Sequence, residues 1–61
     1  RKSKADRKRF FEISRGTLIE VDTAIGVAYD LELLTDDQVA DLGELIINTF
    51  KVLTGLIKSQ E

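Results

Sequence analysis

The chain has 61 residues and a formal net charge of −2, and it contains no proline, cysteine, histidine, methionine or tryptophan. This length allows one small domain, and the missing histidine and cysteine exclude the usual general base, the thiol nucleophile and most transition-metal sites. The longest apolar run is Leu45-Ile46-Ile47, far short of the ~20 residues that span a bilayer, so no membrane helix is predicted.

A first helix is predicted over residues 4–32. Ser3 is a suitable N-cap, and Asp6 follows three residues later, where its carboxylate complements the helix dipole. Two adjacent rows of mostly apolar residues then recur at helical spacing, and together they cover about 160° of the helix surface. The rows are Phe11, Leu18, Val21, Ile25 and Ala28, and Phe10, Ile13, Thr17, Ala24 and Leu31.

A second helix is predicted over residues 36–58, after a turn at about 33–35. Thr35 is its expected N-cap, Gln38 completes a capping box, and Leu34 and Val39 occupy the positions of a hydrophobic staple. Because so short a connection places consecutive helices side by side, we expect an antiparallel hairpin.

The second helix is apolar over about 220° of its surface, whereas a helix with one neighbour needs a stripe of little more than ~100°. We therefore predict an all-α chain, an antiparallel helical hairpin that is half of a four-helix bundle. The helices that complete it come from an N-terminal part of the same protein, as the start at Arg1 suggests, or from a second copy of the chain. The predicted helix-packing and oligomer surface comprises Phe11, Leu18, Val21, Ile25, Leu42, Leu45, Ile46, Phe50, Val52, Leu53, Leu56 and Ile57.

Charge is distributed unevenly, because residues 1–15 carry seven of the nine basic residues. This basic segment is either a solvated helix start or a patch that contacts nucleic-acid phosphates. The candidate contacts are Arg1, Lys2, Lys4, Arg7, Lys8, Arg9 and Arg15.

Glu20 interrupts the second apolar row of the first helix. It lies either at the edge of the apolar stripe or inside the bundle as a buried acid that fixes the register or binds a ligand. Gly43 lies on the packing face of the second helix, where it would let another helix approach closely. We expect no catalytic residues, no metal and no cofactor, because the sequence offers no nucleophile beside a base.

The motifs together resemble the bacterial four-helix bundle protein family, also described as 23S rRNA intervening-sequence proteins. The similarity lies in Arg1-Lys2-Ser3, in Arg9-Phe10, in Arg15-Gly16-Thr17-Leu18-Ile19-Glu20, in Leu34-Thr35 before the acidic capping box, and in Gly55-Leu56-Ile57-Lys58-Ser59. It spans the whole chain and corresponds to the C-terminal two helices of a family member. Two positions depart from the family pattern: Arg7 replaces an apolar residue, and Glu32 replaces a glycine that would favour the left-handed end of a helix.

The resemblance implies that the hairpin is half of an up-down-up-down four-helix bundle and that such bundles assemble into homopentamers. A similar protein is the accessory factor of diversity-generating retroelements, in which a basic pentamer binds nucleic acid and a reverse transcriptase. The expected function is accordingly a non-catalytic, oligomeric, cytoplasmic four-helix bundle protein, an RNA-associated scaffold. The alternative is a nucleic-acid-binding accessory subunit that uses the basic N-terminal patch.

Overall fold

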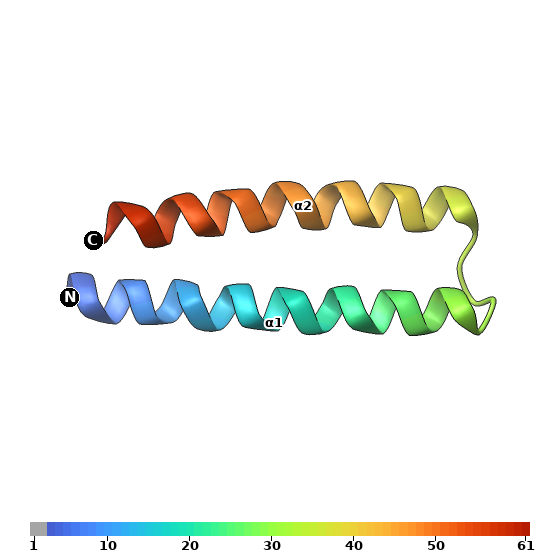
Figure 1. The fold of residues 1–61 in the computed structure, drawn as a ribbon, viewed down its shortest axis with the longest axis horizontal. Coiled ribbons are helices and arrows are strands. Elements are labelled where there is room, and N and C mark those ends of the chain that lie inside the picture. The colour runs from blue at the N-terminus through green and yellow to red at the C-terminus, as the bar shows by residue number, and fades with distance from the viewer. Residues whose placement is uncertain (1–2) are drawn as a thin grey trace.

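The computed structural model describes residues 3–61, which form two α-helices, α1 (Lys4–Asp30) and α2 (Asp36–Ser59). The helices lie side by side and antiparallel, with the connection at one end and the start of α1 beside the end of α2 at the other (Figure 1). The hairpin is 43 Å long and 16 × 15 Å across. The predicted all-α hairpin is confirmed, and the other half of a four-helix bundle stays a prediction.

Both predicted N-caps are present. The Ser3 hydroxyl accepts a hydrogen bond from the Asp6 N–H at 3.1 Å. At the start of α2, the Thr35 hydroxyl accepts from the Gln38 N–H at 3.1 Å, and the Gln38 side chain accepts from the Thr35 N–H at 2.9 Å. The capping box therefore satisfies two backbone donors that would otherwise lack partners.

Helix α1 ends at Asp30, two residues before its predicted end, in a Schellman motif. The Glu32 N–H donates to the Tyr29 carbonyl and the Leu33 N–H to the Ala28 carbonyl, each at 2.9 Å. Glu32 has a φ of 63°, a left-handed conformation that costs a non-glycine residue about 1–2 kcal/mol. The helix thus ends in the usual geometry despite the glutamate, and the connection begins at Leu31, not at residue 33.

The core is a single seam between the two helices. Phe11, Leu18 and Ile25 lie along α1, and Ile46 and Leu53 lie along α2, each row with a spacing of seven residues. All five are half-buried, as is expected when each helix has one neighbour. Among the described residues, only Ile57 is buried, with 6% of its surface exposed.

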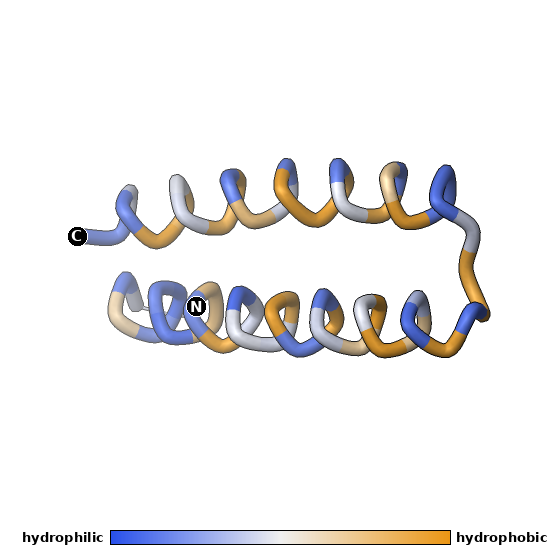
Figure 2. Tube along the Cα trace, turned by 45° about the vertical axis from the view of Figure 1, so that its right-hand side comes forward, coloured by the Kyte–Doolittle hydropathy of each residue, from blue (hydrophilic) through white to orange (hydrophobic). Residues whose placement is uncertain are grey.

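Many large hydrophobic side chains consequently remain in contact with solvent. Figure 2 shows hydrophobic stretches at every turn of both helices, and on α1 they also lie on the side away from α2. The exposed set is Phe10, Ile13, Ile19, Val21, Val27, Tyr29, Leu31, Leu33, Leu45, Ile47, Val52 and Leu56. The hairpin is therefore folded around an incomplete core.

Candidate functional site

Most of the exposed hydrophobic side chains lie on one side of the hairpin. On each helix the central row of this side occupies positions one residue before the seam, which is a rotation of about 100° in the same sense along each chain. This row contains Phe10, Thr17 and Ala24 on α1 and Leu45 and Val52 on α2. Because the two helices face each other and run in opposite directions, this rotation brings both rows to the same side. We call this surface the apolar face. It consists of Phe10, Thr17, Val21 and Ala24 of α1, with Ile13 and Val27 at its outer edge, of Leu31 directly after α1, and of Leu42, Leu45, Thr49, Val52 and Leu56 of α2.

The predicted packing surface is divided between the seam and this face. The seam takes Phe11, Leu18, Ile25, Ile46, Phe50, Leu53 and Ile57, all half-buried except the buried Ile57. Of the remaining predicted residues, Leu42 is half-buried, whereas Val21, Leu45, Val52 and Leu56 are exposed. The hairpin therefore leaves these four side chains without cover.

Glu20 is exposed and continues the row of Ile13 along α1, seven residues farther on. This row lies at the outer edge of the apolar face, farther from the seam than the row of Phe10 and Thr17. Within the hairpin, the carboxylate thus has the position of an edge residue rather than that of a buried acid.

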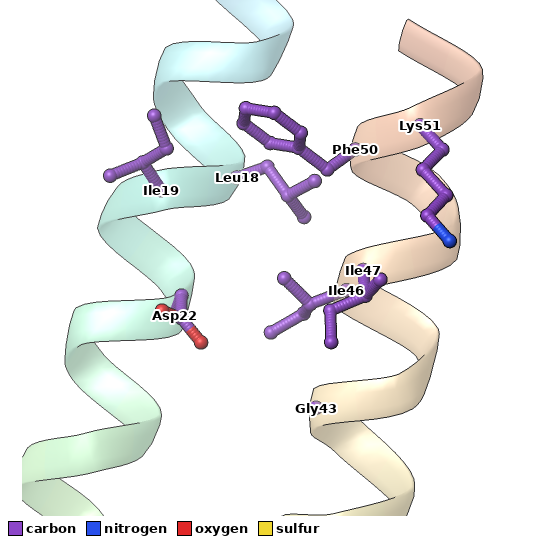
Figure 3. A pocket seen from close by; sticks show the side chains of 8 residues that line it. All are labelled: Leu18, Ile19, Asp22, Gly43, Ile46, Ile47, Phe50 and Lys51. Carbon is purple, nitrogen blue, oxygen red and sulfur yellow. The ribbon is translucent and has the colours of Figure 1, made fainter. Parts of the chain in front are cut away.

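The opposite side of the hairpin contains an open groove of about 430 Å³. Leu18, Ile46 and Phe50 form its floor between the helices, and the charged side chains of Asp22 and Lys51 lie at its sides (Figure 3). A Cβ added at Gly43, which also lines the groove, would meet no atom within 4 Å. Helix α1 therefore does not approach Gly43 closely, and the close approach of another helix at this position stays a prediction.

Three of the candidate nucleic-acid contacts are engaged with α2 and its C-terminal end. The Arg7 Nε donates to the Gln60 side chain at 2.9 Å, and the Lys8 ammonium lies 3.6 Å from the Glu61 carboxylate. The Arg15 guanidinium donates to the Thr54 hydroxyl at 3.4 Å and lies over the Phe50 ring, 5.6 Å from its centre.

Of the other candidates, Lys4 lies one helical turn before Arg7 and Lys8, on the same side of α1. Lys4 and Arg9 are exposed, and Arg1 and Lys2 lie outside the described residues. Arg7 and Arg9, two residues apart on a helix, project about 200° from each other. Among the described basic residues, Lys4, Arg7, Lys8 and Arg15 thus lie on one side of α1, within an arc of about 100°, and Arg9 projects away from them.

One polar pair at the turn was not predicted from the sequence. The Tyr29 hydroxyl, at the end of α1, donates a hydrogen bond to the carboxylate of Asp36, the first residue of α2. This hydrogen bond and the negative charge of Asp36 raise the pKa of the Tyr29 phenol above its usual value of 10.0. The spacing of seven residues between an aromatic and an acid across a predicted turn is the only sequence signal for this contact, and it is weak.

Chemistry on this scaffold is limited by the side chains it presents. Among residues 3–61, no three acids lie together in an arrangement that could hold a metal ion. Within the same residues, neither helix has the length and apolarity needed to cross a bilayer. Comparisons with protein-family models, curated proteins and solved structures gave no match.

Proposed function

We propose that this chain is a non-catalytic assembly element, one half of an oligomeric four-helix bundle that serves as an RNA-associated scaffold. The apolar face carries the assembly part of this proposal. Leu45 and Val52 are each 61% exposed, and burying side chains of this size contributes about 1.5–3 kcal/mol each. The RNA association, the cytoplasmic location and membership of the four-helix bundle family belong to the same proposal and rest on the resemblance of the sequence motifs.

The total accessible surface supports an interface. A folded monomer of 6.9 kDa is expected to expose about 4,000 Å², whereas the hairpin exposes 4883 Å². The excess of roughly 900 Å² is similar to the ~800 Å² that each partner buries in a standard protein interface. Exposed apolar patches of several hundred Å² mark interaction sites in soluble proteins. The excess surface is thus of the size that one covering partner removes.

Two matched substitutions test this function. Leu45 and Ile47 lie on the same helix, are 61% and 57% exposed, and lie on opposite sides of the hairpin. We expect Leu45→Gln to weaken self-association by about tenfold or more, because a buried leucine loses its transfer free energy. We expect Ile47→Gln to leave the dissociation constant from sedimentation equilibrium within about twofold. Equal effects of the two substitutions would contradict an interface on the apolar face.

A second candidate function is that of a nucleic-acid-binding accessory subunit. The observation in its favour is the concentration of basic residues at the start of α1, where Lys4 and Arg9 are exposed. Any assembly of hairpins would repeat this basic segment and add to its attraction for phosphates.

Binding of a fluorescent single-stranded RNA at increasing salt tests the second candidate. We expect a steep loss of affinity with salt, because each neutralised phosphate releases counterions. The double variant Lys4→Gln, Arg9→Gln should reduce the slope of log affinity against log salt concentration. The variant Lys51→Gln, on the groove side of α2, should leave this slope unchanged. Undetectable binding at low salt would exclude this candidate and leave the assembly role intact.

A further inference from the structure

Charge is separated along the length of the hairpin. Residues 16–50 contain eight acidic residues and no lysine or arginine, whereas residues 1–15 and 51–61 together contain nine basic and three acidic residues. Because α1 and α2 are antiparallel, residues 16–50 form the half that contains the turn, and the two terminal segments form the open half (Figure 1). The turn half therefore carries a formal charge of −8 and the open half one of +6.

We propose that a second copy of this chain covers the apolar face, with the turns of the two hairpins at opposite ends. This inference rests on the proposed assembly function and adds the identity and orientation of the partner. The charge separation supports this orientation. A second hairpin of the same length, turned end for end, places its basic open half against the acidic turn half of the first hairpin, and its acidic turn half against the basic open half.

Two twofold arrangements place one apolar face on another. In one, the turns lie at the same end, so that −8 faces −8 and +6 faces +6. In the other, the turns lie at opposite ends, and each acidic turn half faces a basic open half. Every helix has antiparallel neighbours in both arrangements, so the helix dipoles do not choose between them, and the complementarity of the charged halves does.

The dimensions of the hairpin fit this partner. The apolar face runs over both helices for about 30 Å, the distance from Phe10 to Leu31 at 1.5 Å per residue, on a molecule 43 Å long and about 16 Å wide. A second hairpin has the same length and carries the same continuous face, as an isologous twofold interface requires. Glu20, at the outer edge of this face, remains within reach of solvent at the rim of the dimer.

Spin labelling measures the orientation directly. The chain has no cysteine, so Leu33→Cys provides a single attachment site in the turn, at a side chain that is 70% exposed. With the turns at opposite ends, the distance between the two nitroxides should approach the 43 Å length of the hairpin. With the turns at the same end, it should be roughly 20 Å, set by a helix spacing of 8–10 Å and the label linkers.

A control and a salt series separate the possible outcomes. Adding Leu45→Gln to the labelled chain should abolish the dipolar coupling, because the dimer dissociates. Raising the ionic strength from about 0.05 to 0.5 M should weaken the wild-type dimer by about fivefold, because complementary charges are screened.

A stable dimer with the short distance, or one that salt strengthens, would overturn the orientation and leave the assembly function in place. A mass above that of a dimer would overturn the two-copy arrangement. A monomer without coupling would overturn both proposals.

Discussion

The two ends of the hairpin are held by different kinds of interaction. At the turn, the contacts join residues close in sequence: the Schellman motif at Glu32, the Tyr29–Asp36 hydrogen bond and the Thr35–Gln38 capping box. At the open end, the contacts join residues far apart, such as Arg7 and Gln60 with a separation of 53 residues. The turn is therefore specified by local contacts, whereas the open end depends on the packing of one helix on the other.

Truncating the buried side chain at the open end should have the largest effect on the free energy of unfolding. Ile57 is 6% exposed, so Ile57→Ala removes a buried side chain and leaves a cavity. We expect the free energy of unfolding to fall by about 2–4 kcal/mol in urea titrations at fixed chain concentration. Ile47→Ala, on the exposed groove side, should cost less than about 1 kcal/mol. Similar losses for both would show that the open end has no core of its own.

The two N-caps give the next comparison. Thr35→Ala removes a capping box at the turn and should cost about 1 kcal/mol. Ser3→Ala removes a single cap bond at the open end, where the helix terminus frays, and should cost about half as much. Thermal unfolding followed by circular dichroism measures both. A larger loss for Ser3→Ala would contradict the view that local bonds dominate at the turn.

Glu32 provides a substitution that should strengthen the turn. Glu32→Gly relieves the left-handed strain at φ 63° and should stabilise the fold by about 0.5–1 kcal/mol, after the greater freedom of the unfolded chain is subtracted. The same exchange at the exposed helical position Glu44 should destabilise by about 1 kcal/mol. The predicted opposite signs can be checked in one series of urea titrations, and a loss of stability at both positions would exclude the strain.

The Tyr29–Asp36 bond should have the smallest effect on stability, and it is best followed by titration. Tyr29 is the only tyrosine and tryptophan is absent, so tyrosinate absorbance reports this side chain alone. Its pKa should lie above 10.0, and Asp36→Asn should lower it toward the usual value. Because the folded-state pKa exceeds the unfolded one, the bond stabilises the fold below about pH 10, and this contribution is lost as the pH rises through the folded pKa. An unchanged pKa in Asp36→Asn would contradict the contact.

The helices and the turn could be predicted because their signals are local. Ser3 and Thr35 have the residue types and spacings of N-caps, and the apolar rows repeat at helical intervals. The predicted end of α1 lies two residues after the observed one, because Leu31 and Glu32 are both compatible with a helix. Only the backbone conformation shows that the Schellman motif begins there.

The sequence predicts which residues are apolar contacts, but only in part which of them lie in the seam and which on the apolar face. The wide apolar arc of the second helix indicated a missing neighbour, but the division of Leu45 and Ile46 between the face and the seam follows from how the two helices meet. The pairing of Arg7, Lys8 and Arg15 with Gln60, Glu61 and Thr54 depends on the axial alignment of α1 and α2. No local pattern encodes that alignment, so the sequence alone does not show which basic residues contact α2.

The central claim is that the apolar face is an interface between copies of this chain. Sedimentation equilibrium, with thermal unfolding at several chain concentrations, tests it most directly. We predict a mass of twice 6.9 kDa and a melting temperature that rises with concentration, because dimerisation stabilises the folded state by mass action. A helical species of 6.9 kDa whose melting temperature does not depend on concentration would contradict the claim.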